Sequence, residues 1–420
     1  MSESLLERRE HLLGPRLTTF YDEPVHLVRG LGTKLWDADG REYLDCYNNV
    51  PHVGHCHPKV VEAICAQAGT LNTHTRYLHE GIVNYAESLT ATFAEPLRAM
   101  TLTCTGSEAN DIALRMARAV SGEIGVIATD HTYHGNTMAV SQLSCTNPPP
   151  DRWENVEFVP APDSYRPVTS AEWAGHVTAA IARLKAKGFG LSALIIDPYF
   201  ANEGFPDLPK GWLDPALAEV RAAGGVVIAD EVQPGFGRLG THFWGHEKAG
   251  FLPDIVTMGK PMGNGHPVAG VVTSRAVMAA FRDTFRYFNT FGGNPVSMAA
   301  AQATFDVLRE EGLQENAREV GDYAREGLRA LAGGHECIGD VRGSGLFFGA
   351  ELVLDRATKA PATAFTKAVA NALRQKGVLM NFMGVHYNVL KIRPPMPFSR
   401  GDADRMLDAV DEVLGEVPLG

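Results

Sequence analysis

Short apolar segments alternate with longer amphipathic segments through the middle of the chain. The apolar segments are almost continuous in β-branched residues, which is typical of strands buried on both faces of a mostly parallel sheet. Apolar positions between them recur every three or four residues, as over 107–120 and 213–223, and predict helices. This alternation predicts a doubly wound α/β domain, which binds ligands at the carboxyl ends of its strands. The predicted strands are AMTLTC (99–104), IGVIAT (124–129), SALIID (192–197), GGVVIAD (224–230), DIVTMG (254–259) and VAGVVTS (268–274).

The two ends of the chain have a different pattern. Near the beginning, KLWDADGREYLD (34–45) predicts a hairpin around an Asp-Gly turn, and a helix is expected to start near Pro58. Near the end, GLFFGAELV (345–353) predicts a strand followed by two amphipathic helices, as in a smaller α+β unit. The Pro-rich stretch 146–167 predicts a long surface excursion.

Composition and charge narrow the class of protein. With 420 residues, 45% of them hydrophobic, the chain can form one large and one smaller domain. The net charge of −11 argues against a general nucleic-acid or anionic-membrane binder, and we find no apolar run long enough to span a bilayer. Six dilute cysteines without CxxC, and a beginning unlike a secretory signal, predict a cytoplasmic protein.

A cluster of potential metal ligands occurs in HVGHCHP (52–58), which contains His52, His55, Cys56 and His57. A metal site requires deprotonated ligands at tetrahedral reach and a supporting outer shell. Adjacent residues in a loop with Gly and Pro rarely reach that geometry. We therefore expect a turn at this point and no metal site.

The motif CTGSEAND (104–111) follows a predicted strand and opens a predicted helix. Thr105 and Glu108 have the spacing of a capping box, and Gly106 permits another group to approach the backbone closely. The amides of Gly106 and Ser107 then point outward from the positive end of the helix dipole and favour a phosphate. A plain capped helix is the alternative interpretation.

Two charged residues follow other predicted strands. Asp230 ends an apolar strand, where a carboxylate either needs a cationic partner or caps the next turn. Lys260 follows another predicted strand, in a loop rich in Gly and Pro. Each alone has an ordinary structural explanation. Together with the helix start at Gly106 they supply what a pyridoxal phosphate enzyme needs: a Schiff-base lysine, an acid for the ring nitrogen and amides for the phosphate. The other Gly-rich segments lack the spacings of dinucleotide and nucleoside triphosphate sites.

With these motifs the chain resembles the class III aminotransferases, pyridoxal phosphate enzymes of fold type I, from about residue 20 to 415. The resemblance rests on TGSEAND, TYHG, IADEVQPGFGR, VTMGKPMGNG, FNTFGGNP and RGSGLFFGAEL. It implies a mostly parallel central sheet in a large cofactor-binding domain (56–309). A smaller α+β domain would be formed by both chain ends (1–55 and 310–420). Within the family, the chain is most similar to the branch that includes the ethanolamine-phosphate phospho-lyases, in segments 43–58, 71–79, 254–269 and 390–396.

The resemblance implies roles for individual residues at the cofactor. Lys260 would form the Schiff base and carry protons, and Asp230 would pair with the pyridine nitrogen. Tyr133 would stack on the ring with support from His134. A homodimer with its active site at the subunit interface is implied, because one phosphate ligand would come from the partner subunit. The remaining assignments are Gly106 and Ser107 at the cofactor phosphate, Gln233 near the ring hydroxyl, and Thr290 as the ligand from the partner.

The sequence departs from the family pattern where the substrate is expected. In KIRPP, Lys391 stands where many members have an arginine that forks onto the substrate carboxylate, and Arg393 follows two residues later. DPYF (197–200) replaces the common Glu-Pro-x-Gln, so a shorter acid and two aromatic residues stand at the usual substrate gate. Arg76 in TRYLH is a candidate phosphate clamp together with Lys391; a surface or interface ion pair is the alternative for it.

These residues favour a pyridoxal phosphate enzyme that acts on a small amine. The leading interpretation is a phospho-lyase that converts an amine such as O-phosphoethanolamine to an aldehyde, phosphate and ammonia. The alternative is an ω-type aminotransferase that moves the amino group to a keto acid, and the cofactor motifs are the same for both. Ammonia-lyase chemistry on an aminophosphonate, or racemisation, is a third option. A non-catalytic protein of this fold is disfavoured because Lys260, Asp230 and Tyr133 are all present.

Overall fold

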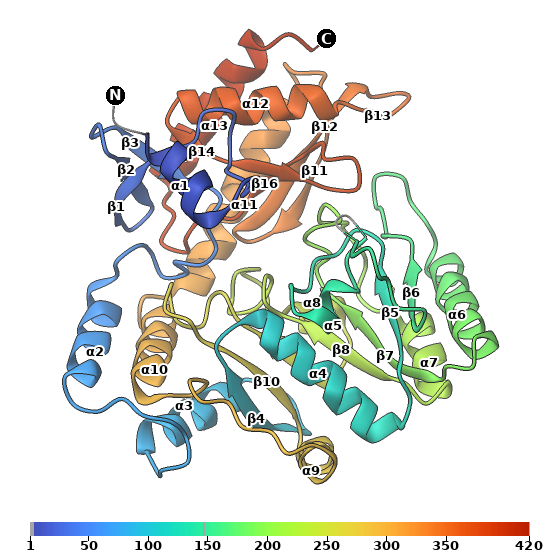
Figure 1. Ribbon diagram of the computed structural model, residues 1–420. Coiled ribbons are helices and arrows are strands. Elements are labelled where there is room, and N and C mark those ends of the chain that lie inside the picture. Colours follow the sequence, from blue (N-terminus) through green and yellow to red (C-terminus); the bar gives the residue numbers. More distant parts are fainter. Residues whose placement is uncertain (1–3, 146–147, 420) are drawn as a thin grey trace.

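A seven-stranded sheet forms the centre of the structure, a computed structural model that describes residues 4–145 and 148–419 (Figure 1). The strand order is β4-β10-β9-β8-β7-β5-β6. Pairing is parallel from β9 to β6, whereas β10 is antiparallel to both of its neighbours. The strands are β4 (Leu97–Thr103), β5 (Gly125–Thr129), β6 (Val156–Val159), β7 (Leu191–Ile196), β8 (Val226–Asp230), β9 (Ile255–Met258) and β10 (Ala269–Ser274).

All six strands that the apolar runs predict belong to this sheet. The prediction of a surface excursion over 146–167 is wrong for one part, because β6 pairs in parallel with β5 as the edge strand. VEFV is a Pro-free run of four residues, and an edge strand tolerates the neighbouring prolines because it pairs on one side only. Residues 146 and 147 of that stretch lie outside the described residues.

Both faces of the central sheet are covered, which explains the continuous apolar runs. In β7, Leu194 and Ile196 pack with α6 (Ser170–Ala186) and α7 (Asp214–Ala222), whereas Ala193 and Ile195 pack under α4 (Gly106–Ser121) on the other face. Alternate residues of a strand point to opposite faces, so a strand between two helical layers needs apolar residues at every position. Figure 1 shows α4 crossing the sheet on the near side.

Strands from both chain ends meet in a second sheet, of order β1-β2-β3-β14, where β14 pairs in parallel with β3. A third sheet is antiparallel, with the order β11-β12-β16-β15 and β13 paired to β12. These strands are β1 (Leu27–Leu31), β2 (Lys34–Asp37), β3 (Glu42–Asp45), β11 (Ile338–Ser344), β12 (Phe347–Asp355), β13 (Ala360–Pro361), β14 (Val378–Leu379), β15 (Asn381–Met383) and β16 (Val389–Ile392).

The other helices lie outside these three sheets. α11 and α12 pack on the third sheet, and α13 packs on both of these helices. α2 and α3 pack on α10, which leads from the central sheet toward α11 (Figure 1). Within the described residues, none of the helices has the length and apolar character needed to cross a membrane. The helices not yet given are α1 (Leu5–Leu13), α2 (Pro58–Ala68), α3 (Glu80–Thr90), α5 (Met138–Ser141), α8 (Gly245–Ala249), α9 (Arg275–Thr284), α10 (Pro295–Glu310), α11 (Leu313–Leu331), α12 (Thr363–Gln375) and α13 (Arg400–Glu416).

Candidate active site

A pocket with an empty volume of about 480 Å³ lies at one edge of the central sheet. β4, β8 and β9 run in the same direction, because β10 is antiparallel to both β4 and β9. Their carboxyl ends therefore meet at this edge, and the residues that follow each strand come together there. The pocket is lined by Gly106, Ser107, Tyr133, His134, Gly135, Asp197, Asp230, Val232, Gln233 and Lys260. It brings together seven of the residues predicted to contact the cofactor.

The beginning of α4 offers backbone amides to the pocket. Thr105 Oγ1 accepts from the Glu108 amide at 3.2 Å, and the Glu108 carboxylate accepts from the Thr105 amide at 2.9 Å. This capping box leaves the Gly106 and Ser107 amides without an acceptor in the described part of the chain, at the positive end of the helix dipole. Gly135 packs so closely that a Cβ on it would lie 2.5 Å from Ser107 Oγ. The result is a tight cradle for an anion such as a phosphate.

Asp230, the last residue of β8, is held by three hydrogen bonds. Its Oδ2 accepts from His134 Nδ1 at 2.7 Å and from Asn110 Nδ2 at 2.9 Å, and its Oδ1 accepts from the Val232 amide at 3.1 Å. Asn110 is completely buried, and its own Oδ1 accepts from Thr257 Oγ1 at 2.6 Å. The carboxylate is therefore fixed in position at the pocket wall, as the partner of a protonated ring nitrogen needs to be.

His134 and Asn110 thus act on Asp230 rather than directly on a ligand. His134 Nδ1 carries a proton because the Asp230 carboxylate accepts there, and its Nε2 lies 3.1 Å from Thr132 Oγ1. The hydrogen bonds of His134 thus support the Asp230 carboxylate. The sequence analysis instead predicts that His134 supports Tyr133, which is half exposed. The prediction missed Asn110; the available signal was a polar residue beside the apolar stripe of α4.

Lys260 follows β9 and is partly buried at the pocket. Burial lowers the pKa of its ammonium, the charge of Arg393 lowers it further, and the carboxylates of Asp230 and Asp197 oppose this effect. A lysine with a lowered pKa is more often the neutral amine, which is the form that attacks a carbonyl carbon. Lys260 therefore has the environment of a nucleophile and proton carrier rather than of a solvated loop lysine.

Two buried cations converge on one amide oxygen behind the pocket wall. Gln233 Oε1 accepts from Lys391 Nζ at 3.0 Å and from Arg393 Nη1 at 2.7 Å. Asn202 Oδ1 lies 3.3 Å from both Lys391 Nζ and Gln233 Nε2. The exposed fractions of Lys391 and Arg393 are 3% and 8%, and neither forms a salt bridge with a carboxylate of the described chain. The side-chain hydrogen bonds of these two basic groups in the described chain therefore go to neutral amides and not to a carboxylate.

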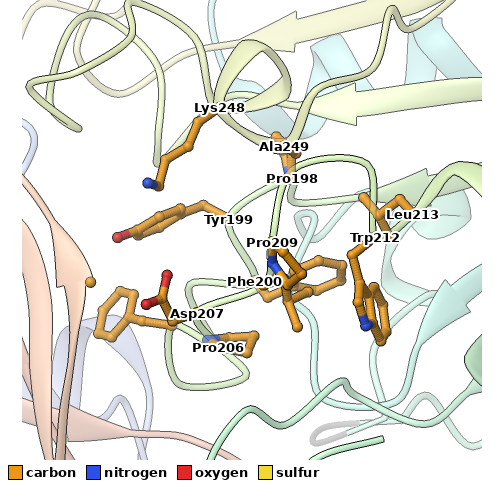
Figure 2. A pocket seen from close by; sticks show the side chains of 13 residues that line it. Pro198, Tyr199, Phe200, Pro206, Asp207, Pro209, Trp212, Leu213, Lys248 and Ala249 are labelled. Atoms are coloured by element: carbon orange, nitrogen blue, oxygen red, sulfur yellow. The ribbon is translucent and has the colours of Figure 1, made fainter. Parts of the chain in front are cut away.

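The aromatic residues of DPYF do not narrow this pocket. Asp197 lines it and caps the following turn, accepting from the amides of Tyr199 at 2.9 Å and Ala201 at 3.2 Å. Burial raises the pKa of Asp197 well above its usual range, with the charges of Glu203 and Asp230 nearby. Tyr199 and Phe200 instead line another pocket, among prolines and Trp212 (Figure 2). These two aromatic side chains therefore lie outside the lining of the Lys260 pocket.

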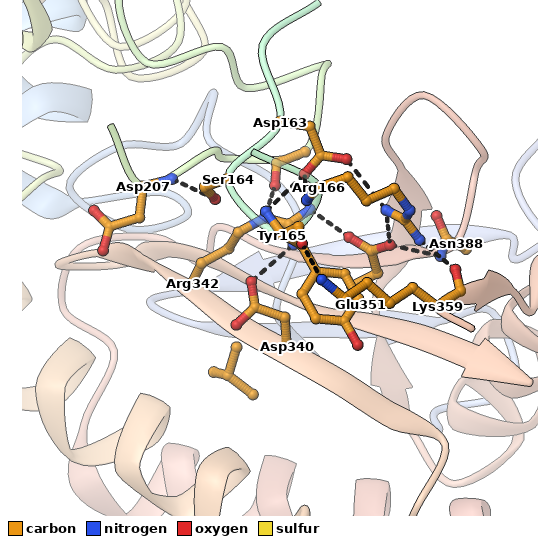
Figure 3. A network of polar contacts seen from close by, with 12 residues as sticks. Asp163, Ser164, Tyr165, Arg166, Asp207, Asp340, Arg342, Glu351, Lys359 and Asn388 are labelled. Carbon is orange, nitrogen blue, oxygen red and sulfur yellow. Dashed lines mark hydrogen bonds and ion pairs between the residues drawn. The ribbon is translucent and has the colours of Figure 1, made fainter. Parts of the chain in front are cut away.

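The turn that carries Asn202 is anchored to the third sheet. Arg342 Nε donates to the Gly204 carbonyl at 2.6 Å, and Arg342 Nη2 pairs with Glu351 at 2.7 Å. Arg166 shares the same buried Glu351 carboxylate at 2.8 Å, so two arginines meet on one acid (Figure 3). The wall of the active site is therefore tied to β11 and β12 by a buried ionic network.

A second buried contact joins three distant parts of the chain. Arg238 is completely buried and donates to the carbonyls of Leu346 at 3.0 Å and Pro394 at 2.7 Å, and to His52 Nδ1 at 3.2 Å. His52 Nε2 donates in turn to the Phe236 carbonyl at 2.8 Å. Burial and the charge of Arg238 lower the pKa of His52 to about 3, so this histidine is neutral at pH 7. The contact fixes the segment that follows Arg393.

The other histidines of the HVGHCHP loop have protein partners. His55 Nε2 lies 2.7 Å from the Asp45 carboxylate, and His57 Nε2 lies 3.1 Å from Glu311. Over residues 4–145 and 148–419, no three His, Cys, Asp or Glu side chains are grouped as a metal ion requires. The loop functions as a turn that leads into α2.

Arg76 and Thr290 do not line the Lys260 pocket in the single chain. Both are exposed, and the Arg76 guanidinium stacks over the Phe288 ring at 3.9 Å, two residues before Thr290. Phe288, Tyr77 and His74 form an aromatic cluster on the same surface. These two predicted residues therefore lie together, but apart from the other nine, which the structure groups at the Lys260 pocket and around Gln233.

Nearly the whole chain is similar to known proteins. The profile of the aminotransferase class-III family matches residues 20–414. A Drosophila melanogaster protein named alanine–glyoxylate aminotransferase 2-like is 42% identical, over 99% of this chain and 87% of its own. A Caenorhabditis elegans protein named ethanolamine-phosphate phospho-lyase homolog 1 is 38% identical, over 98% of this chain and 93% of its own.

Solved structures show the same two kinds of relative. A phospholyase from Arthrobacter, in complex with phosphoethanolamine, has a TM-score of 0.95 and 43% identity, covering 99% of this chain and 100% of that one. An aminotransferase from Bacillus anthracis has a TM-score of 0.89 and 26% identity, covering 98% of each chain. The fold thus agrees with that of solved class III aminotransferase relatives, which are pyridoxal phosphate enzymes.

Proposed function

Since this chain belongs to the class III aminotransferase family and is a pyridoxal-phosphate-dependent enzyme, we propose that it is a phospho-lyase of small phosphorylated amines. Its substrate would be an amine such as O-phosphoethanolamine, and the products would be an aldehyde, phosphate and ammonia. The relatives from C. elegans and Arthrobacter, named for this activity, support the proposal over nearly the whole chain.

The observation that carries the proposal is the pair of buried cations behind Gln233. A phosphomonoester has a second pKa of about 6 and is close to a dianion at neutral pH, so it brings about two negative charges. Lys391 and Arg393 lack a carboxylate partner in the described chain, and a substrate phosphate would supply the missing charge. Arg393 offers a planar fork to two phosphate oxygens, and Lys391 offers a point charge.

The pocket residues fit pyridoxal phosphate. The cradle of Gly106, Ser107 and Gly135 suits its phosphate, and the fixed Asp230 carboxylate would hold a proton on the ring nitrogen. When bound, the cofactor supplies an electron sink that stabilises negative charge on the carbon bearing the substrate nitrogen. Lys260, which has a lowered pKa, would take the proton from that carbon.

The site would be completed by a second copy of the chain. The surface around Arg76 and Thr290 exposes large apolar side chains, with exposed fractions of 65% for Tyr77 and 40% for Phe288. A homodimer would cover them and bring these residues to the partner's pocket. Light scattering is expected to give the mass of a dimer.

Arg76→Ala is expected to raise KM for a phosphorylated amine steeply with little change in cofactor content; an unchanged KM would exclude Arg76 as a clamp.

An aminotransferase is the second candidate, because the Drosophila relative carries that name at 42% identity. The same Lys260 and Asp230 would serve it, and Lys391 would bind the carboxylate of a keto acid. The two activities differ in the fate of the substrate phosphate, which an aminotransferase leaves attached.

One comparison separates the two candidates. The holoenzyme is incubated with O-phosphoethanolamine without an acceptor, and inorganic phosphate and ammonia are measured. A parallel reaction contains pyruvate and is assayed for alanine. We expect equal amounts of phosphate and ammonia without pyruvate, and none with Lys260→Ala. Formation of alanine without phosphate release would refute the phospho-lyase and support the aminotransferase.

A further inference from the structure

Elimination of phosphate makes a chemical demand that amino transfer does not make. If the carbon–oxygen bond of a phosphomonoester dianion breaks without help, the leaving group is the phosphate trianion, a strong base that leaves poorly. If a proton reaches the bridging oxygen as the bond breaks, hydrogen phosphate leaves instead. A phospho-lyase therefore needs a proton donor beside the substrate phosphate, in addition to the base that acts on carbon.

The described residues around the two cations offer few donors. Lys260 is needed at the carbon, and the guanidinium of an arginine such as Arg393 is too weak an acid to serve as a proton donor. The Asp197 carboxyl accepts from two backbone amides of its own turn, which fix its direction. Glu203 Oε1 accepts from Thr129 Oγ1, and in the described chain Glu203, unlike Lys391, has no hydrogen bond to Gln233 at the pocket lining. Lys391 is the remaining group.

Lys391 is oriented for this task by its surroundings. Its ammonium has three N–H groups, of which two point at Gln233 Oε1 and Asn202 Oδ1, leaving one without an acceptor in the described chain. The rings of Phe205 and Phe347 flank Nζ at 5.9 and 5.7 Å. Its polar partners therefore lie on the side of Gln233, which lines the Lys260 pocket.

We propose that Lys391 is a catalytic residue, the general acid that protonates the departing phosphate; this inference rests on the proposed phospho-lyase function. Lys391 Nζ gives its proton to the bridging oxygen while the carbon–oxygen bond breaks and its electron pair stays on that oxygen. Arg393 holds the non-bridging oxygens. Lys391 is left as a neutral amine and regains a proton from water. Overall, O-phosphoethanolamine and one water give acetaldehyde, ammonium and hydrogen phosphate, with equal charge on both sides.

The electrostatics of the site agree with this role. Burial lowers the pKa of the Lys391 ammonium well below its usual range, as does the charge of Arg393. The carboxylates of Asp197 and Glu203 act in the opposite direction. A weakly held proton is transferred more readily, and the arriving phosphate dianion favours the protonated form before the transfer.

The test separates proton abstraction at carbon from departure of phosphate. The holoenzyme and its variants are incubated with O-phosphoethanolamine in D2O. Phosphate release is measured beside solvent deuterium in the unreacted substrate, by proton NMR. Lys391→Arg keeps the positive charge but cannot act as an acid. We expect its phosphate release to fall by about 10²- to 10⁴-fold. Deuterium exchange at the carbon that bears nitrogen should continue at a rate within about threefold of wild-type turnover.

Binding is followed separately by calorimetry with inorganic phosphate. Lys391→Arg should bind phosphate within about threefold of wild type, which shows that charge and fold are kept. Arg393→Lys is the matched control: it weakens phosphate binding but leaves the ratio of exchange to release unchanged. Asp197→Asn tests the other buried acid and should not raise that ratio.

Three outcomes would overturn the proposal. If exchange and release fall together in Lys391→Arg, the residue is a clamp. If both persist, it is dispensable. If Asp197→Asn alone raises the ratio of exchange to release, Asp197 is the acid. A wild-type enzyme that releases no phosphate would refute the proposed function itself, and this result is visible before any variant is compared.

Discussion

Replacement of His52 by glutamine should remove a defined part of the acid sensitivity of this protein. His52 donates through Nε2 to Phe236 and accepts at Nδ1 from Arg238. A glutamine amide also has one donor group and one acceptor, so His52→Gln can keep both contacts. It cannot take up a proton near neutral pH. The variant therefore isolates titration from packing.

The magnitude follows from the pKa of His52, which is about 3 in the folded chain against 6.5 for an unperturbed histidine. The folded state favours the neutral ring, so stability is complete above pH 6.5 and is lost as the pH falls from 6.5 toward 3. Linkage gives a loss of about 2 kcal/mol at pH 5 relative to pH 8. With an unfolding entropy of about 2.1 cal/mol/K per residue, this loss corresponds to about 2 °C in a chain of this length.

The assay is thermal unfolding of the holoenzyme at pH 8 and pH 5, at one scan rate, for the wild type and His52→Gln. We expect the two midpoints to be close at pH 8. The decrease between pH 8 and pH 5 should be about 2 °C smaller in the variant, because all other groups titrate equally in both. Equal decreases of the midpoint in the two proteins would show that His52 takes up its proton without loss of its contact with Arg238. That result would refute the reasoning.

Three further substitutions test the packing around the site. Gly135→Ala places a methyl group 2.5 Å from Ser107 Oγ, so we expect about tenfold weaker cofactor retention, measured by the visible absorbance after dialysis; full retention would contradict the cradle. Gly321→Ala puts a methyl group 2.0 Å from the Gly345 carbonyl oxygen and should lower the unfolding free energy by about 1–3 kcal/mol, seen as a lower thermal midpoint. Glu351→Gln removes the acid that two arginines share and should destabilise by about 3–5 kcal/mol, whereas an unchanged midpoint would show that the network contributes nothing.

The sequence predicts the cofactor side of the site because it depends on strand order alone. Asp230 and Lys260 each follow a buried parallel strand, and carboxyl ends of parallel strands share one edge. The capping box of Thr105 and Glu108 is local and was therefore visible. The pairing of β6 could not be predicted, because a four-residue strand between prolines has the sequence pattern of a loop.

The substrate side depends on contacts between residues far apart in the chain. Lys391 lies on β16, which pairs with β12, and from there it reaches Gln233. Arg342, on the neighbouring strand β11, holds the turn that carries Asn202. No periodicity in the sequence encodes that meeting, although KIRPP marked the segment as unusual. Arg76 and Thr290 lie on an exposed surface, where neither strand order nor a local motif fixes their position relative to the pocket.

The order of the site residues along the chain has a consequence for how the enzyme is made. Gly106, Asp230 and Lys260 leave the ribosome well before Lys391 and Arg393, by a time on the order of 10 s. The central sheet is complete at Ser274, whereas β14 and β16, which close the other two sheets, come last. A nascent chain can therefore contain Gly106, Asp230 and Lys260 while it still lacks Lys391 and Arg393, so the residues at the cofactor pocket can assemble before the proposed substrate site is complete.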